Sequence, residues 1–206
     1  MAMQREDHWR TVYTDKQPED VSWYQPAPTQ SLHALDRFAA EPSQSLIDIG
    51  GGASTLVDAV LARGWGDVTV LDIAAPALAA AQLRLGEASS AVTWAVADIT
   101  SWRPPRHYDI WHDRAVFHFL TEPAQRAAYL GALTSGLAAG GLAIFATFAL
   151  DGPEKCSGLV VERFDADKLA ATLGAQFILE ASWRDEHVTP WRSAQAFTWC
   201  VFRRAV

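Results

Sequence analysis

The chain has 206 residues, half of them hydrophobic, which suits one sizeable core and leaves too little for two complete domains. Its formal net charge is −7, and its 17 Lys and Arg form no basic run, so the composition argues against a nucleic-acid partner. Two cysteines are too few for a disulfide scaffold, and we expect a reducing, cytoplasmic environment.

Residues 1–43 are rich in aromatic side chains, whereas a disordered tail would be poor in them. The polar residues 1–10 lack the apolar stretch of a secretion signal. We therefore expect this segment to fold as a lid over a bound ligand, with Tyr13 or Trp23 near a positive charge that an aromatic ring attracts. The alternative is an ordinary packing helix.

From residue 45 onward, short apolar runs alternate with stretches of helical spacing. We predict strands at 45–49, 68–71, 92–96, 108–112 and 142–148, and helices at 55–63, 77–85, 123–137 and 165–173. This alternation indicates a doubly wound α/β domain with a mostly parallel sheet and helices on both faces. Two further strands, 177–183 and 196–202, are expected to pair antiparallel at one edge.

The uncharged segment 127–150 is long enough to cross a bilayer. Gly136, Gly140 and Gly141 interrupt it where a helix would end. We therefore predict a helix, a glycine turn and a buried strand, and no membrane partner.

A glycine-rich turn follows the first strand, at the sheet edge where ligands of such folds bind. It comprises Gly50, Gly51, Gly52 and Ser54, and Asp48 lies just before it. Small residues let a ligand approach the backbone and let the next helix begin tightly. Three adjacent glycines that merely form a tight turn are the alternative.

Acidic residues also end the second and third strands. Asp72, with Ile73 beside it, follows the last glycine at about the distance where an acid accepts hydrogen bonds from ribose hydroxyls. Asp98 can accept from the amino group of an adenine ring that rests on Ile99. With Asp48, three successive strand ends carry acids, and this order predicts an adenosine ligand.

A dinucleotide oxidoreductase is the natural rival. Its turn requires a third glycine where this chain has Thr55. Asp48 would also repel a diphosphate, whereas it suits a cationic ligand. The pattern therefore favours a sulfonium that carries an amino group.

The motif Asp48-x-Gly50-x-Gly52, with Asp72 and Asp98 after it, resembles the successive cofactor motifs of class I S-adenosylmethionine-dependent methyltransferases. The resemblance covers residues 45–148. It implies S-adenosylmethionine as cofactor, S-adenosylhomocysteine as product, and a single Rossmann-like domain, residues 1–206, with a seven-stranded sheet that has one antiparallel strand. Residues 44–206 would form its core. Ser54 replaces a third glycine that is common in the family.

By this resemblance, the end of the fourth strand lies beside the transferable methyl group. The run Asp113-Arg114-Ala115 is similar to the thiopurine and thiol methyltransferase branch, and an acid followed by a base also resembles elongation-factor lysine methyltransferases. We expect Asp113 and Arg114 to be catalytic, and Asp113 also to contact the cofactor. The alternative is that the two form a local ion pair.

His118 is the candidate general base, because its ordinary pKa is near neutrality and the loop should point it toward the cleft. A packed side chain among apolar neighbours is the alternative. His112 is expected to face the sheet packing. A missing base would be no obstacle, since alignment and exclusion of water supply most of the acceleration when the nucleophile is already a thiolate or neutral amine.

The turn-rich loop 151–158 lies where the family's substrate pockets commonly lie, so Lys155 and Cys156 can line such a pocket. No role is assigned to His187. The expected function is transfer of a methyl group to a small-molecule acceptor, with a thiol or other soft nucleophile as first choice. A protein-lysine methyltransferase and a non-catalytic cofactor-binding module are the alternatives.

Overall fold

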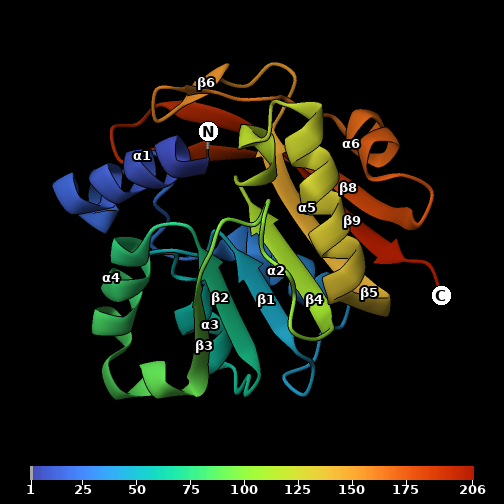
Figure 1. Cartoon of the computed structure of the whole chain (residues 1–206), viewed down its shortest axis with the longest axis horizontal. Coiled ribbons are helices and arrows are strands. Elements are labelled where there is room, and N and C mark those ends of the chain that lie inside the picture. Colours follow the sequence, from blue (N-terminus) through green and yellow to red (C-terminus); the bar gives the residue numbers. More distant parts are fainter. Residues whose placement is uncertain (1) are drawn as a thin grey trace.

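The computed structural model describes the backbone of residues 2–206 and the side chains of residues 5–17 and 19–206 (Figure 1). Its α-helices are α1 (Ala2–Asp15), α2 (Thr29–Arg37), α3 (Leu56–Ala62), α4 (Ala75–Leu85), α5 (Pro123–Gly136) and α6 (Ala166–Leu173). Its strands are β1 (Leu46–Ile49), β2 (Val68–Asp72), β3 (Val92–Val96), β4 (Tyr108–Arg114), β5 (Leu137–Phe148), β6 (Lys155–Cys156), β7 (Leu159–Val160), β8 (Phe177–Val188) and β9 (Ala194–Arg204). Short 3₁₀ turns are η1 (Pro18–Asp20), η2 (Gly86–Ala91) and η3 (Phe117–Phe119).

Seven strands form one sheet in the order β3-β2-β1-β4-β5-β9-β8. β1 pairs in parallel with both β2 and β4, and β9 is antiparallel to its neighbours β5 and β8. This is the predicted Rossmann-like sheet with one antiparallel strand. The strand order reverses between β1 and β4, and ligands of open α/β sheets bind at such a switch point, outside the carboxyl ends of the strands.

Apolar side chains fill the space on both faces of the sheet. Every residue of β1 and β2 is buried, as expected of parallel strands that are covered on both sides. α2, α3 and α4 contribute to one core, and α5 and α6 to the other. Pro123 begins α5, where a capping box of Glu122 and Gln125 satisfies the first backbone groups of the helix.

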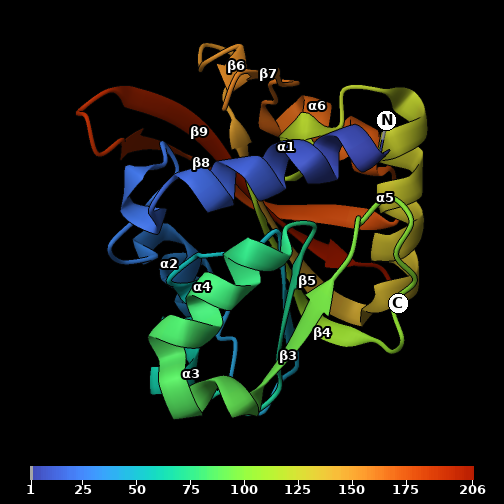
Figure 2. The same ribbon diagram turned by 60° about the vertical axis from the view of Figure 1, so that its left-hand side comes forward.

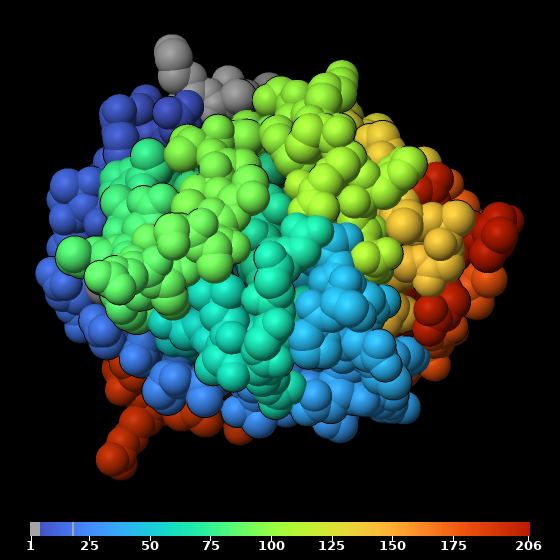
Figure 3. All heavy atoms as spheres, turned by 90° about the horizontal axis from the view of Figure 1, so that it is seen from below, coloured from blue at the N-terminus to red at the C-terminus, as the bar shows by residue number. Residues whose placement is uncertain are grey.

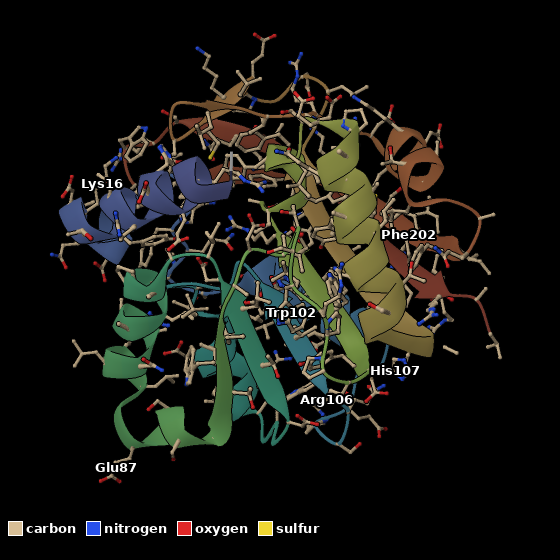
Figure 4. The ribbon with its side chains drawn as sticks, viewed as in Figure 1. Lys16, Glu87, Trp102, Arg106, His107 and Phe202 are labelled. Carbon is tan, nitrogen blue, oxygen red and sulfur yellow. The ribbon has the colours of Figure 1, made fainter. Side chains whose placement is uncertain are left out.

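The two ends of the sheet differ. α1 lies across one end, beside α4 and below β6, in two views turned by 60° (Figures 1 and 2). The loops that precede the strands close the opposite end, which Figure 3 shows together with the projecting β8–β9 turn. Figure 4 places Lys16 near the end of α1 and Arg106 and His107 at the opposite end of the molecule. α1 therefore covers the end at which β1, β2 and β4 terminate.

Several element boundaries differ from the sequence predictions. β5 begins at Leu137 rather than at residue 142, because the segment with Gly140 (φ +75°) forms an irregularity in the β4 pairing instead of a free turn. β8 and β9 are longer than predicted because they pair along most of their length. The loop after β5 contains the short β6–β7 pair. No helix in the described part of the chain is long and apolar enough to span a membrane.

Candidate functional site

A cavity lies at the covered end of the sheet and has about 770 Å³ of empty space, counting its open mouth. Gly50, Asp72 and Asp98 line it from the ends of β1, β2 and β3, and Arg5 and Trp9 line it from α1. The acids predicted from two separate strands therefore share one cavity with the N-terminal segment.

The glycine turn has no room for side chains. A Cβ on Gly50 (φ +67°) would overlap the side chain of Val116, and one on Gly52 (φ +36°) would lie 2.6 Å from a carboxylate oxygen of Asp72. A Cβ on Gly51 would lie 2.5 Å from Asp48 Oδ2. Gly51 and Gly52 are thus packed against the acids of β1 and β2, and Gly50 alone of the three glycines lines the cavity.

Asp72 has an unusual carboxyl group. The residue is 6% exposed, one carboxylate oxygen accepts from the Ala74 N–H at 2.8 Å, and none of the described residues forms an ion pair with it. Burial raises its pKa to about 7. Asp72 and its neighbour Ile73 line the cavity, so a ligand hydroxyl can donate a hydrogen bond to this carboxylate.

Asp98 has partners on two sides. Thr100 donates to one oxygen through its N–H at 2.9 Å and its hydroxyl at 2.7 Å. Arg5 on α1 forms an ion pair with the other oxygen at 2.9 Å. Ile99 beside it is buried and lines the cavity as an apolar surface. The sequence did not single out Arg5, because one arginine in a polar segment carries no periodic signal.

Asp48 does not line the cavity. It is 3% exposed, and its Oδ1 accepts from His112 Nδ1 at 2.7 Å, while the other ring nitrogen lies 2.9 Å from Ser31 Oγ. Its Oδ2 lies beneath Gly51. The expected direct contact of Asp48 with a cationic ligand does not match this position, because the carboxylate is directed under the turn toward β4.

Aromatic side chains from three segments form an aromatic cluster, which we define as Trp9, Tyr13, Trp23 and Phe119. Trp9 makes edge-on contacts with Trp23 and Phe119, with ring centroids 5.5 and 5.0 Å apart. Trp23 Nε1 donates to the Tyr13 hydroxyl at 3.1 Å. All four residues line the cavity, so the structure brings Tyr13 and Trp23 together at one place, and their contact with a positively charged ligand stays a prediction.

Asp113 and Arg114 do not form the local ion pair that was the alternative to a catalytic role. They are successive residues of β4, so their side chains lie on opposite faces of the sheet. Asp113 is fully buried, accepts from the N–H groups of Val116 and Phe117, and receives the Tyr129 hydroxyl at 2.5 Å. The expected catalytic and cofactor-binding roles of Asp113 do not fit this position, because its carboxylate holds the loop and faces α5. Arg114 faces the cavity.

The expectation that His118 points into the cleft is wrong. The residue is fully buried and lies outside the cavity, packed between Phe119 and Phe148 with ring centroids 4.5 and 4.7 Å away. Its Nδ1 accepts from the Phe148 N–H at 3.3 Å. Burial, with the nearby Arg114 charge, lowers its pKa to about 3, so it cannot accept a proton near neutral pH. The packed-side-chain alternative describes His118.

The remaining candidates divide between the cavity and the surface. Cys156 is buried and lines the cavity, and burial raises the pKa of its thiol to about 11, whereas Lys155 is exposed. Ser54 is exposed and lines a smaller neighbouring cavity, where its Oγ accepts from the Leu56 N–H. His187 lies 2.7 Å from the Ser22 carbonyl oxygen and thereby fixes the N-terminal segment to β8. Among the described residues, no cluster of His, Cys, Asp or Glu could hold a metal ion.

Known proteins resemble this chain in sequence over its central part and in structure over nearly its whole length. Residues 47–143 match the family model described as "Methyltransferase domain". No curated protein matches the sequence.

Solved structures share the fold at low sequence identity. A methyltransferase from Anabaena variabilis described as SAM-dependent has a TM-score of 0.77 and 15% identity, and the match covers 98% of this chain and 94% of that one. The 1,6-didemethyltoxoflavin-N1-methyltransferase of Burkholderia thailandensis, solved with S-adenosylhomocysteine, has a TM-score of 0.70 and 20% identity over 99% and 85% of the two chains. The N-methyltransferase NodS of Bradyrhizobium japonicum, also solved with S-adenosylhomocysteine, has a TM-score of 0.71 and 17% identity over 96% and 99%.

Proposed function

We propose that this chain is a class I S-adenosylmethionine-dependent methyltransferase that methylates a small molecule at a thiol or another soft nucleophile, which the matching family model and the similar structures support. The observation that carries the proposal is the cavity itself. It joins the predicted adenosine-binding residues to an aromatic cluster and to Arg114, and it contains no histidine among its described lining residues.

The residues present fit the cofactor. A side chain would not fit at Gly50, which faces Val116, or at Gly52, which faces Asp72. The backbone of Gly50 lines the cavity, where a ligand can approach it. Asp72 can accept both ribose hydroxyls, and Asp98 can accept the adenine amino group above Ile99. The order of these residues along the sheet, β1 to β2 to β3, matches the order of the cofactor's parts.

S-adenosylmethionine supplies an electrophilic methyl group: the acceptor's lone pair forms the new bond to carbon, and the electrons of the broken C–S bond stay on S-adenosylhomocysteine. The chain's residues bind, orient and exclude water. The rings of Trp9, Trp23 and Tyr13 present apolar faces that attract a positive charge. Trp9 and Tyr13 belong to α1, so this helix brings the two rings to the cavity and limits the access of water to it.

The N-terminal segment acts as a lid in this proposal. Arg5 forms an ion pair with the Asp98 carboxylate, and α1 packs against α4. A ligand that binds Asp98 therefore has to share this carboxylate with Arg5 or displace the first turns of α1. Closure of such a lid after binding would shield the reacting atoms from solvent.

A soft nucleophile is favoured because the two carboxylates among the described lining residues, Asp72 and Asp98, are assigned to the adenosine, which leaves no further carboxylate and no histidine as a base for a poorly acidic acceptor. His118 lies outside the cavity, and the Cys156 thiol stays neutral at pH 7. A thiol ionises without help more readily than an alcohol. One similar structure (TM-score 0.74, 18% identity) carries the description "Conversion of a Disulfide Bond into a Thioacetal Group during Echinomycin Biosynthesis", so this fold accommodates a reaction at sulfur in that protein.

The test uses S-adenosylmethionine that is radiolabelled in its methyl group, incubated with the protein, a panel of small thiols and amines, and a cell extract. We expect label in low-molecular-weight thiol products. Label in precipitable protein would replace the small-molecule proposal with a protein-lysine methyltransferase. Cofactor binding without transfer to any acceptor would indicate a binding module.

A further inference from the structure

Arg114 places an incompletely bonded guanidinium in the cavity. Its Nη1 donates to the Trp23 carbonyl oxygen at 3.0 Å, and its guanidinium carbon lies 5.3 Å from the centre of the Phe197 ring. Its Nη2 is shielded from solvent and makes no hydrogen bond to any residue whose side chain the structure describes. A guanidinium has five N–H donors and is charged at any physiological pH, so this atom lacks a partner.

Within the described part of the chain, no acid forms an ion pair with Arg114. Burial lowers its pKa to about 10, while the charges of Asp185 and Asp48 favour its charged form, so the group is still cationic at neutral pH. Asp48 is bonded to His112, and Asp185 accepts from Gln30 at 2.8 Å. Asp113 lies on the opposite face of β4. The Cys156 thiol on the same cavity wall stays neutral, because burial raises its pKa to about 11.

Arg114 lies on the side of the cavity away from the residues assigned to the adenosine, which is the side left for the acceptor. Asp72 and Asp98 mark the adenosine side at β2 and β3, whereas Arg114 ends β4, where the β6 residue Cys156 and the ring of Phe119 also line the cavity. Trp9 and Trp23 add flat apolar surfaces beside it. A guanidinium next to aromatic faces is complementary to a planar anion.

We propose that Arg114 binds the anionic group of a small planar acceptor, such as an aromatic thiolate or thioacid. The inference rests on the proposed function and narrows its substrate class. Arg114 also borders the smaller cavity, so the carboxylate of the cofactor is the competing anion. An anionic acceptor would neutralise the guanidinium beside the cationic cofactor and would need no proton acceptor, which agrees with the position of His118 outside the cavity.

The probe pair is thiobenzoate, which is anionic, and thiobenzamide, a neutral molecule of nearly the same shape. Their binding is measured by calorimetry and by tryptophan fluorescence, with and without saturating S-adenosylhomocysteine. We expect the wild-type chain to bind thiobenzoate about tenfold or more tightly than thiobenzamide. Arg114→Gln should reduce this ratio to about one, and Arg114→Lys should restore part of it.

Arg103→Gln is the matched control, because Arg103 is exposed and does not line the cavity. Thermal unfolding of each variant reports whether its fold is intact. Equal binding of both probes to the wild-type chain would overturn the proposal, whatever the variants do. An unchanged probe ratio in Arg114→Gln, with a tenfold loss of S-adenosylhomocysteine affinity, would assign Arg114 to the cofactor carboxylate instead. Failure of the wild-type chain to bind S-adenosylhomocysteine would contradict the proposed function, while the probe ratio without cofactor would still decide the anion site.

Discussion

Arg5 Nη2 on α1 lies 2.9 Å from a carboxylate oxygen of Asp98, at the end of β3 and 93 residues away in the sequence. The two side chains are 19% and 11% exposed, so solvent only partly screens the pair. This contact joins the first turn of the N-terminal segment to the residue expected to recognise adenine. It is the contact that a bound cofactor would have to share or break.

Arg5→Ala should increase the association rate of S-adenosylhomocysteine about fivefold, because opening α1 no longer breaks an ion pair worth about 1 kcal/mol. Stopped-flow tryptophan fluorescence measures this rate, since Trp9 and Trp23 line the cavity. Arg10→Ala is the control, because Arg10 pairs with Asp7 on an exposed part of the same helix. Equal rates in the wild type and Arg5→Ala would show that α1 does not gate entry.

Gly50→Ala should abolish measurable S-adenosylhomocysteine binding and destabilise the fold by about 2 kcal/mol or more, because the new Cβ would overlap Val116. Gly64→Ala is a matched control for backbone strain. Gly64 also has a positive φ, of +84°, and nothing within 4 Å of its hypothetical Cβ. Gly64→Ala should therefore cost only about 1 kcal/mol and leave binding intact. Thermal unfolding and calorimetry distinguish the two, and equal losses of binding would refute a specific role for the turn.

The affinity for S-adenosylhomocysteine should fall as the pH is lowered through about 7. Burial raises the pKa of Asp72 to about 7, and its ionised form is the better acceptor for ribose hydroxyls. Affinity should change by up to about tenfold per pH unit below the pKa, and Asp72→Asn should remove this dependence and weaken binding above pH 7. Calorimetry between pH 5.5 and 8.5, as an approximate range, measures both curves. Parallel pH curves for the two proteins would exclude Asp72 from the site.

The same group affects stability without ligand. Since the pKa of Asp72 in the folded chain exceeds its unfolded value, its stabilising contribution is complete below about pH 4 and is lost as the pH rises through about 7. Asp72→Asn should therefore raise the unfolding free energy relative to the wild type most clearly above pH 7. Urea unfolding at pH 5 and pH 8, chosen as roughly below and above the pKa, measures the difference.

His118→Asn should retain catalysis within about threefold, since removal of a true general base typically costs about 10²–10⁴-fold. The variant should unfold about 1–2 kcal/mol more easily, because His118 packs between two rings and accepts from the Phe148 N–H. Turnover of S-adenosylmethionine with an accepted thiol or amine measures the rate. A loss of a hundredfold or more in a folded variant would restore His118 as the base.

Local patterns predicted the fold because its strands are short, apolar and regularly separated by helices. The ends of β5, β8 and β9 depend on pairing with distant strands, and no local pattern reports those partners. The sequence predicts a lid or packing segment at residues 1–43 but not the bounds of α1, because this helix has little amphipathic character and its apolar residues form no clear face.

Part of the site also followed from the sequence. Gly50, Asp72 and Asp98 end successive strands, and parallel strands bring their carboxyl ends together, so their convergence was predictable. The roles around β4 were not. The sequence predicts a strand that stops at residue 112, which would leave Asp113 and Arg114 as neighbours in a loop. The strand continues through both residues and separates their side chains.

Calorimetric titration of the wild-type chain with S-adenosylhomocysteine at pH 7.5, a value roughly half a unit above the Asp72 pKa, tests the central claim most directly. The account predicts one site per chain with a micromolar dissociation constant, roughly −8 kcal/mol, and no comparable binding of a nicotinamide dinucleotide. A folded chain that releases no heat with S-adenosylhomocysteine, or that binds the dinucleotide more tightly, would contradict it.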